Sequence, residues 1–190
     1  MSLQVIGDPV LHSKSPVIHG AMLAALGLDI PYTAHVVRRG ELPEYLFWAK
    51  TNGVTGFNAT MPHKEDLIPL LDEIHPAAKA VGAVNTVCLR HGRWTGFNTD
   101  GGGAVAALKD GLGMDPNRLT VTLLGAGGAA KAAALALSQA GAKQVFICNR
   151  TLGRAEELCA HDPLKRLTPA AFDVDTLSNL AAKSQLLVNC

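Results

Sequence analysis

An amine placed where it could transfer protons is the most informative group in this sequence. Lys64 closes the segment Pro62-His63-Lys64, which follows Phe57-Asn58-Ala59-Thr60 after one intervening residue. The pattern predicts a helix over residues 64–71 with Lys64 in its first turn. The unpaired amides of a helix N-terminus carry about half a positive charge and disfavour an ammonium ion there. Lys64 is therefore a candidate proton donor and acceptor; the alternative is a solvated surface lysine.

A pair of serines forms the second polar cluster, in the segment His12-Ser13-Lys14-Ser15-Pro16. This segment lies between an apolar run at residues 3–6, which predicts a strand, and a helix expected over residues 16–25. Ser13 and Ser15 thus fall in a turn, where hydroxyl groups either cap the helix or bind a polyol ligand. Capping alone would account for one of the two serines.

Two further polar clusters flank a predicted hairpin. Gly82-Ala83-Val84-Asn85-Thr86 enters a strand expected at residues 85–90, and Gly96-Phe97-Asn98-Thr99-Asp100 leaves the next, at residues 93–97. His91-Gly92 lies between them as a two-residue turn, so we expect Asn85 and Asp100 at the same end of the hairpin. The alternative for Asp100 is an N-cap of the helix that follows it, to about residue 112.

Together these segments resemble one family. Ser-x-Ser-Pro, Asn-x-Thr-x-Pro-His-Lys, Gly-Ala-Val-Asn-Thr and Asn-Thr-Asp-Gly, in this order and at these separations, closely resemble the shikimate dehydrogenases. The resemblance implies an α/β substrate domain followed by an NADP-binding domain. It also implies an oxidoreductase that interconverts shikimate and 3-dehydroshikimate, in the chorismate pathway of aromatic amino acid biosynthesis.

The same resemblance assigns roles to individual residues. Lys64 is implied as the proton donor and acceptor, with Asp100 as the partner that orients the amine and offsets its charge. The implied ligands of the substrate's ring hydroxyls and carboxylate are Ser13, Ser15, Thr60, Asn85 and Asp100. One donor within about 3 Å of the reacting oxygen is what a ketone reduction requires of the protein.

A glycine-rich turn predicts the cofactor site. Residues 119–124 form an apolar run of strand length, and an alanine-rich helix is expected to follow, to about residue 140. A turn of small residues between strand and helix matches the dinucleotide fingerprint, which needs a tight turn, close backbone approach to a pyrophosphate and close helix packing. Ala130 takes the third small position, and the predicted contacts are Gly125, Ala126, Gly127, Gly128 and Ala129.

The end of the next strand, at residues 144–148, indicates which dinucleotide binds. An NAD site usually has an acidic residue there for the ribose hydroxyls, whereas this sequence continues Asn149-Arg150-Thr151, with Arg154 one turn further on. Two guanidinium groups can bind a 2′-phosphate through charge-assisted hydrogen bonds, so the sequence predicts NADP. The alternative is that Arg150 and Arg154 are solvated surface residues.

Composition limits the remaining possibilities. The net charge of +1 offers no broad basic field for nucleic acid, and 48% hydrophobic residues is typical of a globular protein with a core. No apolar run approaches the roughly 20 residues that cross a bilayer, and no signal peptide is recognisable, so we expect a cytoplasmic protein without a membrane partner. The four cysteines lack metal-ligand spacing, and we expect neither a metal site nor a disulfide.

The predicted organisation is two α/β domains with a site between them. Residues 1–100 form the substrate domain on a mostly parallel sheet, and residues 119–190 form an incomplete Rossmann domain. A helix and loop at residues 101–118 link the two domains. Only three strands are expected in the latter, at residues 119–124, 144–148 and 186–190, the last as an interior strand. Because the family continues further, we expect a C-terminally truncated chain, either a fragment or a natural short form.

Three functional alternatives stay open at this point. The chain is an active dehydrogenase, a module that binds shikimate or NADP without catalysis, or an enzyme with quinate as a further substrate. An exposed half-sheet edge also favours pairing with another chain, possible as a homodimer.

Overall fold

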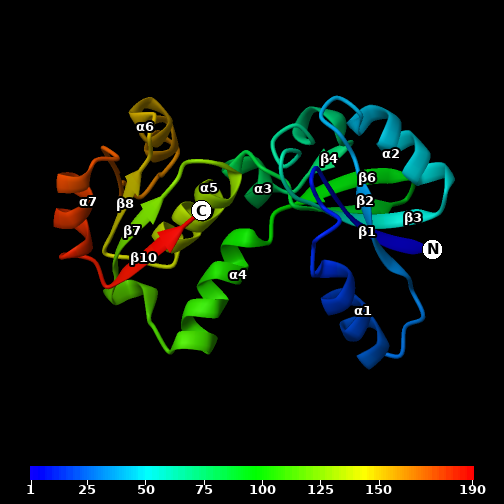
Figure 1. Cartoon of the computed structure of the whole chain (residues 1–190), viewed down its shortest axis with the longest axis horizontal. Coiled ribbons are helices and arrows are strands. Elements are labelled where there is room, and N and C mark those ends of the chain that lie inside the picture. Colours follow the sequence, from blue (N-terminus) through cyan, green and yellow to red (C-terminus); the bar gives the residue numbers. More distant parts are fainter. The chain divides into compact units, whose positions relative to one another are not determined.

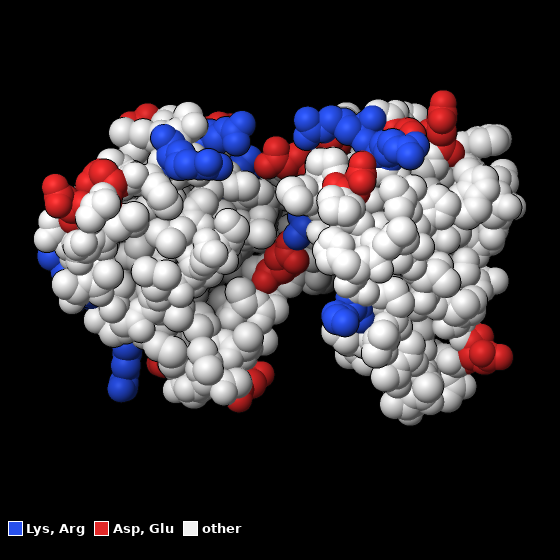
Figure 2. All heavy atoms as spheres, viewed as in Figure 1, with Lys and Arg blue, Asp and Glu red and all other residues white.

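The computed structural model describes all residues from Met1 to Cys190, which form two compact units. Unit 1 comprises Met1–Asn98 and unit 2 comprises Thr99–Cys190. Each unit has its own sheet with helices packed on it (Figure 1), so the fold is of the α/β class. Figure 2 shows basic and acidic side chains interspersed on the visible surface of both units, between broad uncharged areas.

Unit 1 is built on a mixed six-stranded sheet with the order β2-β1-β3-β5-β6-β4. β1, β2 and β3 are parallel, whereas β5 and β6 form a hairpin in which β5 is antiparallel to β3. His91 and Gly92 join the hairpin with φ of 50° and 76°, the positive values that a two-residue hairpin turn requires. The predicted hairpin is thus confirmed. The strands are β1 (Ser2–Gly7), β2 (Tyr32–Val36), β3 (Val54–Ala59), β4 (Glu73–Ile74), β5 (Thr86–Arg90) and β6 (Arg93–Phe97).

Three helices accompany this sheet, α1 (Ser15–Ala25), α2 (Leu42–Thr51) and α3 (Pro76–Val81). In Figure 1, α1 and α2 lie on opposite sides of the sheet. Helix α2 packs four buried side chains into the core of the unit, whereas α1 has no buried residue. That core contains the aromatic pairs Tyr45–Phe57 and Phe57–Trp94, both edge-to-face at centroid distances of 5.3 and 5.5 Å.

The helix expected over residues 64–71 is wrong. This segment forms consecutive turns and ends in a single 3₁₀ turn, η1 (Ile68–Leu70). Pro69 gives the physical reason, because it has no amide hydrogen for the carbonyl of Glu65 and its ring would clash with that carbonyl in an α-helix. The helix-dipole argument for Lys64 is therefore wrong, and a proton-transfer role for this residue has to be argued from other contacts.

Unit 2 has a parallel four-stranded sheet with the order β10-β7-β8-β9. The strands are β7 (Thr120–Leu124), β8 (Gln144–Cys148), β9 (Leu167–Ala170) and β10 (Leu186–Asn189). The helices are α4 (Asp100–Ala106), which continues as the π-helical turn η2 (Ala107–Gly111), then η3 (Pro116–Arg118), α5 (Gly128–Gln139), α6 (Leu152–Ala160) and α7 (Val174–Ala181). None of the helices in either unit is long and apolar enough to span a bilayer.

The prediction of three strands in unit 2 is also wrong, because β9 is a fourth. It was missed because it is short and contains Pro169, which argues against a strand from sequence alone. Proline is tolerated here because β9 is the outer strand and pairs only with β8. The strand expected at residues 186–190 is present as β10, which pairs in parallel with β7; its interior position stays a prediction.

Candidate functional site

Five of the predicted site residues lie on segments at one edge of the sheet in unit 1. β1 and β3 are parallel and end at this edge, and the antiparallel β5 begins there. The segment after β1 carries Ser13 and, as the first residue of α1, Ser15. The turns after β3 carry Thr60 and Lys64, and Asn85 immediately precedes β5. Chain direction therefore places residues that are 72 positions apart in the sequence on loops of a common sheet edge.

The two serines differ in their local contacts. The Ser13 hydroxyl accepts a hydrogen bond of 3.2 Å from the backbone amide of Ser15. Helix α1 begins at Ser15, one residue earlier than expected, and its N-cap residue Lys14 makes no side-chain capping bond. Ser13 thus satisfies one amide at the start of α1, which is the capping role weighed for one serine.

Backbone hydrogen bonds hold the Lys64 turn against the start of β5. The carbonyl of Lys64 accepts a 2.7 Å bond from the amide of Val84, and the carbonyl of Asn85 accepts a 2.9 Å bond from Ala59. The amide of Asn85 in turn donates to the carbonyl of Phe97 at 3.0 Å. Lys64 and Asn85 therefore lie on segments tied to each other by the backbone.

Asn58 reinforces this junction in a way that sequence reasoning missed. Its Nδ2 donates to Thr86 Oγ1 at 3.0 Å and to the carbonyl of Asn85 at 3.3 Å, while its Oδ1 accepts from the Tyr32 hydroxyl at 2.7 Å. Burial raises the pKa of Tyr32 to about 12, so the phenol stays protonated as the donor. The first position of the Asn-x-Thr motif is thus a clamp between β2, β3 and β5.

His63 anchors the same turn from inside the unit. It is fully buried, and its Nε2 lies 2.7 Å from the carbonyl oxygen of Val37. A carbonyl only accepts, so Nε2 carries the proton and donates; Nδ1 is buried without a partner. The imidazole fixes the residue before Lys64 to the end of β2. No sequence signal distinguished this histidine from a ligand.

Asp100 is the first helical residue of α4, and Thr99 takes the N-cap position, so the interpretation of Asp100 as an N-cap is wrong. The neighbouring Gly101 fixes this turn against α5. A Cβ at Gly101 would lie 2.6 Å from the carbonyl oxygen of Ala132 and 2.9 Å from the Cβ of Ala136. Only glycine allows helices α4 and α5 of unit 2 to approach this closely.

The glycine-rich turn of unit 2 lines a hollow of about 290 Å³ at the carboxyl ends of its parallel strands. Gly125 follows β7 with φ of 117°, and a Cβ there would lie 2.9 Å from the carbonyl oxygen of Cys190. Helix α5 begins at Gly128, so its unpaired amides lie at this turn. Nothing lies within 4 Å of a Cβ built on Gly127, which leaves its backbone open to a ligand.

Five of the predicted cofactor residues line this hollow, and four do not. Lining it are Gly125, Ala126, Gly127, Asn149 and Arg150. Gly128 and Ala129 are the first residues of α5, whereas Thr151 is the N-cap of α6 and Arg154 lies in its first turn. Asn149 connects the hollow to the start of α6, because its Nδ2 donates to the carbonyl of Thr151 at 2.8 Å.

The hollow also has walls that sequence reasoning missed. Phe172 comes from the loop between β9 and α7, and Asn189 and Cys190 come from the end of β10. The predicted strand at residues 186–190 was a usable signal for Asn189 and Cys190, since ligands of parallel α/β sheets bind beyond the carboxyl ends of the strands. No aspartate or glutamate lines the hollow, and Arg150 is its one charged side chain.

Two family profiles match the chain, one for each part of this architecture. Residues 5–87 match the family described as "Shikimate dehydrogenase substrate binding domain". Residues 109–190 match "Shikimate / quinate 5-dehydrogenase". Fold and profiles therefore place the chain in a class of two-unit α/β proteins that the profiles describe as shikimate or quinate dehydrogenases.

Individual relatives agree with this class. The shikimate dehydrogenase (NADP(+)) of Alkaliphilus metalliredigens is 40% identical over 190 residues, which cover 98% of this chain and 66% of the relative. That of Geobacter metallireducens is 47% identical over 156 residues, covering 82% of this chain and 54% of the relative. The chain thus spans between about half and two thirds of the length of these curated relatives.

Solved structures extend the likeness to three dimensions. Shikimate dehydrogenase from Aquifex aeolicus matches 100% of this chain and 68% of its own, with a TM-score of 0.88 and 37% identity. The Thermus thermophilus enzyme in complex with NADP(H) and shikimate matches the same shares, with a TM-score of 0.87 and 39% identity. The chain belongs to the shikimate dehydrogenase family.

Proposed function

We propose that this chain catalyses the NADP-linked interconversion of 3-dehydroshikimate and shikimate. The observation that supports this most directly is that all four substrate motifs and the glycine-rich turn occur together in a chain that belongs to the shikimate dehydrogenase family. Substrate binding is assigned to the loops at the sheet edge of unit 1. Cofactor binding is assigned to unit 2, and the proposed domain limits are residues 1–100 and 119–190.

The residues that line the unit 2 hollow fit NADP. Gly127 leaves room for a pyrophosphate beside the start of α5, where backbone amides favour an anion. Arg150 provides the cation for a 2′-phosphate, and no aspartate or glutamate side chain lines the hollow to repel it. When bound, NADP supplies or accepts the hydride; orientation and proton transfer belong to the protein.

The proton transfer is assigned to Lys64, with Asp100 as its partner. A ketone that gains hydride at carbon must gain a proton at oxygen, and a lysine ammonium can donate it and recover it in the reverse direction. The backbone bonds that the carbonyl of Lys64 accepts from Val84 and the carbonyl of Asn85 accepts from Ala59 support this role, because they hold the turn from which the amine extends. A carboxylate near the amine would offset its charge in both directions.

The substrate contacts are assigned to Ser13, Ser15, Thr60, Asn85 and Asp100. Hydroxyl and amide groups select a polyol through hydrogen bonds that an analogue cannot form, because its partners would be left unpaired. Quinate is the second candidate substrate, since the profile matching residues 109–190 names both acids. Quinate differs from shikimate by ring hydration, so the same hydroxyl ligands would serve it.

The test is NADPH formation by the purified 190-residue chain with NADP and shikimate or quinate, beside Lys64→Ala. We expect turnover with shikimate, and a loss of about 100-fold or more in the variant, the scale of losing a general acid. Lys79→Ala, an exposed lysine of α3 in the same unit, is the matched control and should keep full activity. Equal turnover in Lys64→Ala and the control would remove Lys64 from the mechanism.

Binding measurements separate the catalytic proposal from binding alone. Isothermal titration with shikimate and with NADP reports affinity whether or not hydride is transferred. Affinity for both ligands without NADPH formation would mean that this chain is a binding module. Absence of both would contradict the proposed function itself.

A further inference from the structure

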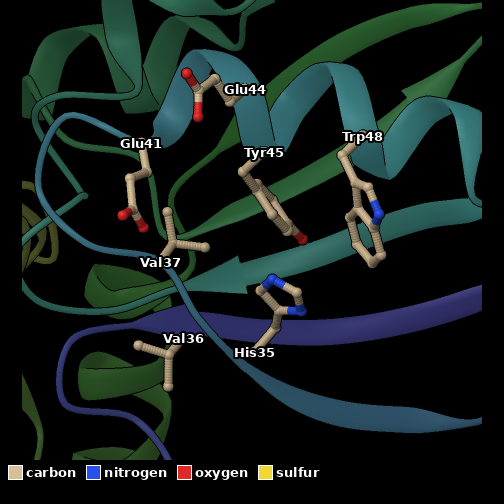
Figure 3. Close-up of a pocket in the computed structure, with 7 residues that line it drawn as sticks. All are labelled: His35, Val36, Val37, Glu41, Glu44, Tyr45 and Trp48. Atoms are coloured by element: carbon tan, nitrogen blue, oxygen red, sulfur yellow. The ribbon is translucent and has the colours of Figure 1, made fainter.

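A second cavity lies in unit 1 and includes none of the residues assigned to substrate or cofactor. It has a volume of about 320 Å³, at the lower end of the range for small-molecule sites. It lies between the end of β2 and the first two turns of α2 (Figure 3). Its lining consists of His35, Val36, Val37, Glu41, Glu44, Tyr45 and Trp48.

Three aromatic rings form a continuous wall of this cavity. The His35 ring centroid lies 5.4 Å from that of Tyr45 and 5.0 Å from that of Trp48, and the Tyr45 and Trp48 centroids are 6.1 Å apart. The Tyr45 hydroxyl donates to Gln4 Oε1 at 2.8 Å, which fixes its ring from below. Trp48 remains 39% exposed, so part of its indole faces solvent at the cavity.

Besides the titratable His35, the ionisable acidic side chains of the lining are two carboxylates, and no lysine or arginine lines the cavity. Figure 3 shows Glu41 and Glu44 at one end of the cavity, Trp48 at the other, and Tyr45 and His35 between them. Glu41 is already engaged, because its Oε2 accepts from the Arg38 amide at 2.8 Å and its Oε1 lies 3.6 Å from Arg38 Nη1. Glu44 takes part in none of the ion pairs, so its charge is available to a ligand.

We propose that this cavity binds a compact organic cation of the alkylammonium class. The faces of tryptophan and tyrosine rings carry partial negative charge and attract cations, most strongly where water is partly excluded. Glu44 adds an attraction that a neutral ligand does not feel, and Val36 and Val37 give apolar contact for alkyl groups. An anion such as shikimate would be repelled by the same lining, so this site is separate from the proposed substrate site.

Choline is the probe, and its neutral isostere 3,3-dimethylbutan-1-ol is the control ligand. Both are titrated into the full chain by isothermal calorimetry and followed by tryptophan fluorescence. We expect saturable binding of choline, weakened by added sodium chloride because the carboxylate attraction is screened. We expect no saturation with the isostere at equal concentrations. Equal binding of both ligands, or no saturation with choline, would overturn the proposal.

Two variants and two matched controls identify the site. Trp48→Leu should weaken choline binding about 2- to 30-fold, the range for loss of a cation–π contact. Glu44→Gln should weaken it about 2- to 5-fold, the scale of a partly exposed charge pair. The controls are Phe47→Leu, an aromatic neighbour that is 74% exposed outside the cavity, and the exposed Glu157→Gln in unit 2.

Both controls should bind choline like the unchanged chain. Fluorescence of the buried Trp94 reports folding in the Trp48 variant. Unchanged affinity in folded Trp48→Leu and Glu44→Gln would place any choline binding elsewhere and refute this site.

Discussion

Replacing Gly101 by alanine should weaken unit 2 by a predictable amount. The added methyl carbon would lie 2.6 Å from the carbonyl oxygen of Ala132 and 2.9 Å from the Cβ of Ala136. Both atoms belong to α5, in which Ala132 is buried. Neither contact can be relieved by rotating a side chain, so α4 and α5 must move apart.

The expected size follows from two opposing effects. Forcing one extra methyl group into a packed helix contact costs about 1–3 kcal/mol. Alanine is intrinsically better than glycine inside a helix by about 0.5–1 kcal/mol. Gly103 in the same helix is the matched control, because a Cβ there meets nothing within 4 Å. Gly103→Ala should therefore stabilise the unit, whereas Gly101→Ala should destabilise it by up to a few kcal/mol.

The measurement is thermal unfolding followed by circular dichroism and by calorimetry. For a domain of about 60–100 residues, each 1 kcal/mol shifts Tm by about 4–8 °C, so the two variants should separate clearly. Trp48 and Trp94 both lie in unit 1, and their fluorescence identifies which transition has moved. A Gly101→Ala chain that melts with or above Gly103→Ala would refute the steric reasoning.

Two further predictions concern charges of unit 2. Arg150→Ala should weaken NADP binding by about tenfold or more and NAD binding far less, because only NADP presents a 2′-phosphate to the guanidinium; equal losses in titrations of both would contradict this role. Asp162 is buried, which raises its pKa, but hydrogen bonds from the Ser138 hydroxyl and three backbone amides outweigh burial and lower it. Because the folded pKa is below the unfolded one, Asp162 stabilises the fold above about pH 4 and loses this effect as the pH falls through the folded value. Asp162→Asn should lower the free energy of unfolding in urea by about 1–3 kcal/mol at neutral pH. This difference in unfolding free energy between variant and unchanged chain should become smaller in acid. A difference that does not change with pH would refute the pKa argument.

The glycine-rich turn shows what the sequence was able to predict. The apolar residues of β7 have the spacing of a strand and those of α5 the spacing of a helix, on either side of Gly125-Ala126-Gly127. The local sequence was therefore enough to predict strand, turn and helix. The hairpin turn at His91 was equally local, since two residues with positive φ decide it. Fold class and the positions of these elements therefore needed no knowledge of long-range contacts.

The errors arise where distant contacts decide the structure. The segment after Lys64 looked helical by its apolar spacing. Pro69 was a local signal against the helix, whereas the turn that forms instead is held by distant bonds to Val37 and Val84. Neither bond is visible in the local sequence. The wall formed by Phe172 and Asn189 likewise depends on how β9 and β10 are arranged around the central strands of unit 2.

Pro169 has a consequence for how unit 2 behaves at high concentration. β9 is an outer strand, and an outer strand usually offers a row of amide hydrogens to which the strand of another molecule can add. Pro169, in register with Ile147 of β8, has no amide hydrogen, so the row is interrupted in the middle of a four-residue strand. This edge of the sheet is thereby protected against fibril-like stacking, by the same residue that hid the strand from prediction.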